Sequence, residues 1–478
     1  MSSPPTLPDA PRRRFLAAQA ALAAAALPFR GAVAAQTAAG TGADGSRLAL
    51  LIGNRDYPGG QDLPPMHTNV RDLQAALQGI GFDVTPQLDQ DRAGATQAVE
   101  AFKLRVEAMP ADGVALFYFC GHGMQVDAEN FLLPSRVFPR ERSLKDSLDL
   151  YVALWRHVVE RIPRRPSGLT ITVVDACRTS PKPLSADDGL NQVRAPEGEL
   201  IVFSTGAGRP ALAPIDDKRR TFFTDALVRQ IERQASHPEE LSFRELFRLV
   251  SADVQQTMRS HPVEDIRELV QIPFIADNSG KPVRVSAKAP PPTPAVAETP
   301  TKEDALAEEE AFNKLRDTLW PSDVLKLARE FATRYPKSRF TSAATVARLG
   351  AEDAYKVLYP SSATAGQTQQ RIGLERRDFQ ARPELGEAYN EDLRRAARGD
   401  KDAAARLGAR LKSSDRSGPS ALRYEDWMKF AAELGNGIAS FELSRYYLEV
   451  GAAAQAARWE ARARQLGFNP PPELRKTR

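Results

Sequence analysis

The sequence predicts an α/β domain with a mostly parallel sheet, followed by an all-α region of helical repeats. Short apolar runs alternate with segments of helical spacing across residues 45–280. A proline-rich linker follows at residues 281–302, and residues 303–478 show only helical periodicity. Alternation of strand and helix favours right-handed crossovers and parallel pairing. With 478 residues the chain is also too long for one ordinary core, so we expect separate domains.

The elements of the first domain follow from periodicity and from the residues that interrupt it. Strands are predicted over residues 47–54, 82–88, from residue 114, 169–174 and 200–204, with a short extended piece at 130–134 and an edge strand at 270–275. Pro273 suits only an edge or a strand end. Helices are predicted over residues 69–79, 96–109, 148–162, 222–234 and 243–258. Asn69 and Gly79 are typical of the start and end of the first helix.

The most informative stretch is residues 114–123, an apolar run that ends in His122 with a glycine on either side. The glycines allow a sharp turn and would leave the imidazole exposed at the carboxyl end of the strand. A second apolar run, residues 169–174, is followed closely by Cys177. Parallel α/β sheets carry their chemistry at the carboxyl ends of the strands. If the two strands are neighbours, His122 and Cys177 face each other.

A thiol next to an imidazole is a candidate nucleophile, because the imidazole can take its proton. The backbone N–H groups of Gly123 and Cys177 would then stabilise the oxyanion formed on attack. A single cysteine or histidine at such a place is more often a packing residue, and the pair together favours catalysis. The other histidines have no comparable setting and are interpreted as ordinary core or surface residues: His67, His157, His237 and His261.

Composition excludes several classes of protein. Only two cysteines occur, Cys120 and Cys177, so the chain has neither a disulfide scaffold nor a cysteine-rich metal site. The net charge of +4 and the absence of a long basic run beyond the amino terminus give no reason to expect nucleic acid. Cys120 either lines the substrate pocket or forms a disulfide with Cys177 that switches the site off.

Residues 1–35 resemble a twin-arginine signal peptide. Arg12, Arg13 and Arg14 precede a mild alanine-rich apolar segment and a small-residue cleavage pattern, Ala32-Val33-Ala34. The alternative is a disordered basic tail. No other stretch approaches the length needed to cross a bilayer, so we expect an exported, periplasmic protein with no membrane span in its mature chain.

The carboxyl-terminal region contains an internal echo. Residues 399–408 and 435–444 align at an offset of 36 residues, and the second copy resembles a Sel1-type tetratricopeptide unit. Two copies fit either a true solenoid or a plain helical bundle. In both cases the region is interpreted as a module that binds a protein partner.

The combined motifs of the first domain resemble the caspase-like cysteine peptidases, and most closely their bacterial metacaspase-like branch. The resemblance rests on the opening Leu-Leu-Ile-Gly-Asn strand, Gly-His-Gly around His122, the piece at residues 130–134, and Asp-Ala-Cys-Arg around Cys177. It covers residues 47–276. It implies a caspase three-layer sandwich, a dyad of His122 and Cys177, cleavage of protein or peptide substrates after Arg or Lys, and self-cleavage in loops.

The same resemblance assigns a substrate pocket and leaves one acid missing. Asp175 matches a pocket carboxylate of the family, whereas Asn69 stands where a second acid is usual and Cys120 where serine is common. Loss of one carboxylate should weaken an ion pair with a basic side chain. Lys182 and Arg194 are the candidate self-cleavage sites.

No cofactor is required by this resemblance, but calcium activation is open. Asp187 and Asp188 could bind calcium or could be ordinary solvated carboxylates. Two other functions also remain open. One is an inactive caspase-like scaffold that recruits envelope proteins through the helical repeats, and the other is a Cys-His hydrolase or transferase of another kind.

Overall fold

The computed structural model describes residues 46–126, 129–137, 145–177, 192–206, 211–214, 216–288, 302–360, 372–412, 419–468 and 470. Contacts divide the chain into Met1–Thr41 and Gly42–Arg478, and every statement below concerns the second unit. The proposed signal peptide at residues 1–35 lies outside the described residues, as do residues 289–301 of the proposed linker.

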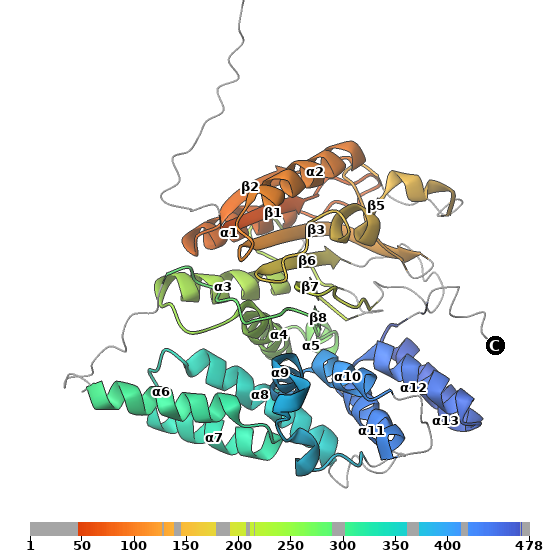
Figure 1. Cartoon of the computed structure of the whole chain (residues 1–478). Coiled ribbons are helices and arrows are strands. Elements are labelled where there is room, and N and C mark those ends of the chain that lie inside the picture. The colour runs from red at the N-terminus through yellow and green to blue at the C-terminus, as the bar shows by residue number, and fades with distance from the viewer. Residues whose placement is uncertain are drawn as a thin grey trace, which may run out of the picture. The chain divides into compact units, whose positions relative to one another are not determined.

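The first domain is built on a twisted sheet of six main strands in the order β2-β1-β3-β6-β7-β8 (Figure 1). The strands are β1 Arg47–Gly53, β2 Asp83–Leu88, β3 Val114–Val126, β6 Leu169–Cys177, β7 Glu199–Phe203 and β8 Phe274–Asp277. Only β8 is antiparallel to its neighbour, and the other pairings are parallel. The expectation of a mostly parallel sheet is therefore confirmed. β2 lies at the edge, where Pro86 costs no ladder hydrogen bond.

Helices cover both faces of this sheet and make a three-layer sandwich. α1 Met66–Gly79, α3 Phe222–Ser236 and α4 Phe243–Arg259 pack on one face, and α2 Arg92–Ala108 packs on the other. Alternate strand residues face the two layers, as Leu50 and Leu51 of β1 show. Burial of each such leucine contributes about 2 kcal/mol. A short helix, α5 Glu264–Glu268, follows α4.

The helix predicted over residues 148–162 does not form. The chain instead makes a 3-10 helix Lys145–Leu150, the short strand β5 Val152–Ala153 and a π-helical turn Trp155–Val159. β5 pairs with β4 Glu129–Leu132, which in turn pairs with the end of β3. The apolar residues of this segment have helical spacing, but strand pairing with β4 outweighs that local preference.

Two predicted element starts are also wrong. α1 begins at Met66 rather than at residue 69, so Asn69 is not a helix cap and its side chain is used elsewhere. β8 begins at Phe274, directly after Pro273, because a proline at residue 273 has no N–H to give to the ladder.

The carboxyl-terminal region, residues 302–468, is helical throughout its described parts and is called the helical region below (Figure 1). Its helices are α6 Lys302–Asp317, α7 Pro321–Arg334, α8 Thr341–Leu358, α9 Glu387–Ala396, α10 Lys401–Arg410, α11 Pro419–Glu433, α12 Gly437–Glu449 and α13 Ala453–Gln465, with 3-10 turns Arg376–Phe379 and Pro383–Leu385. Within the described parts of the chain no helix is long and apolar enough to cross a membrane.

The 36-residue echo corresponds to two equivalent helix starts. Asp400 caps α10 by accepting hydrogen bonds from the N–H groups of residues 402 and 403, and Asn436 caps α12 by accepting one from Ala439. Gly399 and Gly435 precede these caps with φ of 69° and 99°, a conformation that favours glycine. The sequence offset therefore marks a repeated helix–turn–helix start.

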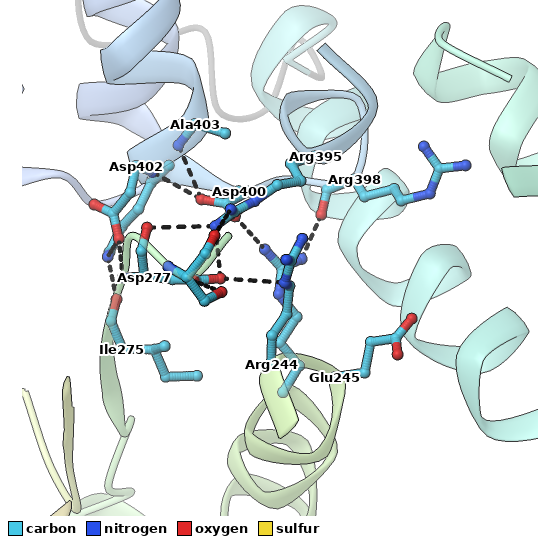
Figure 2. Close-up of polar contacts among 12 residues, drawn as sticks. Arg244, Glu245, Ile275, Asp277, Arg395, Arg398, Asp400, Asp402 and Ala403 are labelled. Atoms are coloured by element: carbon cyan, nitrogen blue, oxygen red, sulfur yellow. Dashed lines mark hydrogen bonds and ion pairs between the residues drawn. The ribbon is translucent and has the colours of Figure 1, made fainter. Parts of the chain in front are cut away.

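A buried cluster of charges joins the helical region to the end of β8 (Figure 2). Arg395 of α9 donates from Nη2 to the Asp277 carboxylate at 2.6 Å and from Nε to the Asp400 carboxylate at 2.8 Å. Nε of Arg244 on α4 lies 3.6 Å from Asp277 Oδ2. The Asp402 carboxylate accepts from the N–H of Asp277 at 2.9 Å. These side-chain bonds fix α9 and α10 against the sheet of the first domain.

Replacing Asp277 by asparagine should make the protein easier to unfold. Asp277→Asn keeps the size of the side chain but leaves the buried Arg395 guanidinium without one of its two carboxylates, a loss of about 3 to 5 kcal/mol. Asp317→Asn removes the carboxylate of an ion pair that is 57% exposed on both sides and should cost less than about 1 kcal/mol. Denaturant unfolding of both variants measures the difference, and equal losses would contradict a stabilising role for the buried cluster.

A second buried carboxylate lies at the same edge of the sheet, at the start of β7, where Leu200 pairs with Asp277. Glu199, the first residue of β7, is 1% exposed, and neither of its carboxylate oxygens has a hydrogen-bond partner among the described residues. Arg164, which is largely exposed, lies 3.7 Å away. Burial raises the pKa of Glu199 to about 7, an effect that Arg164 only partly opposes.

Glu199 should make the protein less stable as the pH rises. The folded chain holds this proton up to about pH 7, whereas the unfolded chain releases it near pH 4.5, so the free energy of unfolding falls between these values. Glu199→Gln should therefore increase the free energy of unfolding at pH 8, by up to about 3 kcal/mol, and leave it almost unchanged at pH 4. Melting temperatures measured at the two pH values check this. A melting temperature lowered equally at both pH values would contradict this.

Candidate active site

Neighbouring strands bring His122 and Cys177 together. β3 and β6 pair in parallel from Val114 with Leu169 to His122 with Cys177, so these last two residues lie directly opposite each other at the end of the ladder. His122 is 3% exposed. The Cys177 side chain lies outside the described residues, but its backbone position follows from this register. The pairing places a thiol-bearing and an imidazole-bearing residue on adjacent strands.

The chain does not turn at His122. β3 continues to Val126 and pairs with β4, so the sharp turn expected at residues 121–123 is wrong. Gly121 serves a different purpose there. A Cβ at this position would lie 2.7 Å from Tyr57 Oη and 2.8 Å from the ring of Phe119, so only glycine lets Tyr57 approach β3 this closely.

Two groups from the loop after β1 position the imidazole. His122 Nε2 lies 2.8 Å from the backbone oxygen of Gln61, and because a carbonyl can only accept, the proton is on Nε2. Nδ1 is then the nitrogen that can take up a proton. The Tyr57 ring meets the imidazole edge-on at 4.5 Å, and its hydroxyl accepts from His122 N–H and donates to the backbone oxygen of Leu133, both at 3.1 Å.

The backbone N–H of Gly123 faces away from β4. Leu133 N–H donates to His122 O at 3.0 Å, which makes Gly123 and its partner Leu132 a non-hydrogen-bonded pair of the antiparallel ladder. The N–H of a residue at such a position points to the other side of its strand. For Gly123 that is the side on which β6 ends at Cys177.

The three residues expected to form the substrate pocket are all fully buried. Asp175 is 1% exposed, and Cys120 and Asn69 are 0% exposed. Asp175 Oδ2 accepts from the hydroxyls of Thr221 at 2.5 Å and Thr224 at 2.7 Å, at the start of α3. The Asn69 amide donates to the same Thr221 hydroxyl and accepts from Thr221 N–H, both at 3.1 Å. Thr221 thus bridges the acid and the amide.

The second oxygen of Asp175 is unsatisfied. Oδ1 makes no hydrogen bond of normal geometry with any described residue, and neither does the buried hydroxyl of Ser204 at the end of β7. Burial raises the pKa of Asp175, while the Thr221, Thr224 and Ser204 hydroxyls lower it in part. A cation brought to Oδ1 would lower the pKa of this carboxyl again.

Cys120 is a buried, reduced thiol on the face of β3 that packs against α1. Its Sγ lies 3.5 Å from the backbone oxygen of Met66 in α1. The register pairs Cys120 with Asp175, two residues before Cys177, so the Cα atoms of the two cysteines are ~8 Å apart by strand geometry. That exceeds the span of a disulfide, and a bond between them would need the strands to shift.

The structure also bears on the candidate self-cleavage sites. Arg194 is exposed, but Gln192 and Ala195 are buried, and cleavage after Arg194 would require both to leave their places. Gln192 is held by the helical region: its N–H donates to Gly467 O at 3.0 Å, and its side-chain oxygen accepts from Gly437 N–H at 2.9 Å. Lys182 lies outside the described residues.

No metal site is present in the described part of the chain, where no three His, Cys, Asp or Glu side chains are arranged to hold an ion. Asp187 and Asp188, the residues considered for calcium, lie outside it.

Sequence reasoning did not find Tyr57, Gln61 or the two threonines. Tyr57 and Gln61 lie in a loop rich in proline and glycine, where no periodicity predicts a contact. Thr221 did carry a signal, because a threonine directly before an apolar helical pattern is a typical N-cap, and its hydroxyl does accept from Thr224 N–H. Its second role, as the partner of Asp175, depends on tertiary structure.

Comparison with known proteins agrees with this fold. Residues 46–282, about half of the chain, match the family model of the caspase domain, Peptidase_C14. This part of the chain has a caspase-like fold and carries a caspase domain, the domain of a cysteine peptidase family.

Among solved structures, the crystal structure of caspase-1 from Spodoptera frugiperda matches with 16% identity and a TM-score of 0.37, covering 51% of this chain and 90% of that chain. A search of the curated proteins gives no match.

The bridge through Thr221 should matter for stability. Thr221→Val removes the hydroxyl between Asp175 and Asn69 and should cost about 1 to 3 kcal/mol, because two buried polar groups lose a partner. Thr96→Val is the matched control: its hydroxyl bonds to Arg92 O on the exposed surface of α2 and should cost less than about 0.5 kcal/mol. Denaturant unfolding gives both values, and a harmless Thr221→Val would show that the bridge is not needed.

Proposed function

We propose that this protein is a cysteine endopeptidase that uses Cys177 as the nucleophile and His122 as the base. The pairing of His122 with Cys177 at the end of the β3–β6 ladder is the observation that carries this proposal. The caspase domain at residues 46–282 supports it, because it belongs to a cysteine peptidase family.

In the proposed reaction each residue has one task. His122 Nδ1 takes the thiol proton, and the Cys177 thiolate attacks the carbonyl carbon of the peptide bond. Gly123 N–H, which points toward the end of β6, stabilises the negative oxygen of the tetrahedral intermediate. The imidazolium then gives its proton to the departing amine as the C–N bond breaks, and water hydrolyses the thioester. Gln61 O holds the imidazole in the required tautomer.

We further propose that cleavage follows Arg or Lys. Oδ1 of the buried Asp175 lacks a hydrogen-bond partner of normal geometry, and burial raises the pKa of this carboxyl. A guanidinium or ammonium group in the pocket would supply a counter-ion. Asn69, which is neutral, gives no second charge, so we expect weaker binding of basic residues than two acids would provide.

The test is hydrolysis of fluorogenic peptides that end in Arg, Lys or Asp, by reduced protein, with and without calcium. Arg and Lys peptides should be cleaved, and Cys177→Ala and His122→Ala should each lower kcat/KM by at least about a thousandfold. Asp175→Asn should act mainly through KM, because it removes the charge that binds the substrate and leaves the dyad intact.

The matched control is a residue of the same type outside the site. His67→Ala removes a histidine that is paired with Asp89 outside the dyad, and it should retain most of the activity. Suppose that Cys177 reacts with an iodoacetamide probe but no peptide, ester or thioester is turned over. The inactive-scaffold hypothesis then replaces the peptidase hypothesis. Turnover of esters alone would instead favour another Cys-His hydrolase.

The cellular location and the partners of the protein are part of the same proposal. The twin-arginine pattern of residues 1–35 supports export to the periplasm, and the repeated helix starts of α10 and α12 support a protein-binding role for the helical region. No cofactor is needed for the proposed chemistry. Calcium would regulate the activity and would not take part in cleavage of the peptide bond.

A further inference from the structure

A cavity lies between the caspase domain and the helical region. Its volume is about 430 Å³, within the range of pockets that hold small organic ligands. The start of α4 and the segment around Arg284 form one wall, and α6, α8 and α9 form the other. The cavity and the dyad lie at opposite edges of the sheet. Arg244 and Arg395 of the lining contact Asp277, which pairs with the start of β7, whereas the dyad lies at the carboxyl ends of β3 and β6.

The lining carries an excess of positive charge. Eight arginines face five carboxylates. One of these five, Glu245, accepts from the N–H and hydroxyl of Ser242 in a capping box rather than from an arginine. Carboxylates outside the lining, such as Asp277 and Asp317, pair with some of these arginines, so that seven of the eight have a carboxylate partner.

Among the eight arginines of the lining, Arg398 is the one without a carboxylate partner in the described residues. Its guanidinium donates to four backbone oxygens, those of Leu315, Arg316, Thr318 and Arg394, and no carboxylate of the described residues lies within ion-pair distance. Burial lowers the pKa of Arg398 to about 10, although Glu391 and Glu245 at longer range oppose this. Figure 2 shows its side chain extending away from the Asp277–Arg395–Asp400 cluster.

Another part of the lining is apolar. Phe312 of α6 and Phe340 stack with their ring centres 4.1 Å apart and their planes 9° apart. Leu315 and Ala347 also line the cavity, and the Arg339 guanidinium lies 4.7 Å above the Phe340 ring. An occupant of the cavity would thus meet both an aromatic surface and guanidinium groups.

We propose that this cavity binds a small organic anion, with its apolar body against Phe312 and Phe340 and its carboxylate or phosphate head at Arg398. Such an anion would supply the counter-charge that Arg398 lacks and would cover apolar surface at the same time. Arg244 and Arg395 line the cavity and also bind Asp277 at the end of β8, so the ligand would contact groups that hold the two parts of the chain together. Binding should therefore also raise the melting temperature.

Isothermal titration calorimetry of the purified full chain tests this with four probes. Decanoate represents an aliphatic carboxylate and AMP an aromatic phosphate, and whichever binds identifies the class of ligand. Inorganic phosphate has the anionic group but no apolar part, and decanol has the apolar chain but no charge. The readout is binding, so the result does not depend on peptidase activity or on the proposed dyad. We expect decanoate or AMP to bind at least about tenfold more tightly than phosphate and decanol.

Two variants locate the site. Arg398→Gln removes the charge of the proposed anion-binding group. Ala347→Leu, on α8, fills part of the cavity, and each variant should weaken binding at least about tenfold. Arg377→Gln, which removes an exposed arginine paired with Glu375, should change nothing. If Arg398→Gln does not fold, Ala347→Leu still decides the question. The proposal is overturned if neither organic anion binds, if phosphate or decanol alone binds as well, or if Ala347→Leu binds like the wild type.

Discussion

The parallel pairing of β3 with β6 is the constraint on which the rest of the molecule depends. It lies at the centre of the sheet, so the helices on both faces pack around it, and its register decides which residues meet at the carboxyl edge. A slip of one residue would turn every side chain of one strand to the opposite face and would separate His122 from Cys177. The apolar core and the proposed chemistry therefore require the same register, and a substitution that disturbs one will disturb the other.

The acid beneath this edge shows how the fold tolerates an unfavourable group. Asp175 lies two pairs before the end of the ladder, and α1 and α3 meet above it through Asn69 and Thr221. Threonine hydroxyls satisfy only one carboxylate oxygen. In the proposed peptidase, the cation of a basic substrate side chain would supply the stabilisation that this carboxylate lacks in the free protein. By contrast Glu199, at the other end of the sheet, has no comparable partner apart from Arg164.

Much of this arrangement could be predicted from the sequence, for reasons visible in particular residues. The central strands are short and apolar on both faces, so residues 114–119 and 169–174 are evident, and the polar residues that follow them mark the edge. Residues 148–162 mislead because their helical spacing competes with strand pairing that only the fold reveals. Tyr57 could not be predicted either, since its contact with His122 depends on a loop conformation and on the missing Cβ of Gly121.

The segment between Cys177 and Gln192 joins two halves that other contacts already hold together. β6 and β7 are paired from Thr170 with Glu199 to Val174 with Phe203, and Gln192 is bound to the helical region through Gly437 and Gly467. A molecule cut once within this segment would keep both halves as a single particle in a sizing column, while a denaturing gel would separate them into two bands. A nicked and an intact molecule would then have the same mass under native conditions. Only under denaturing conditions would the two be distinguished.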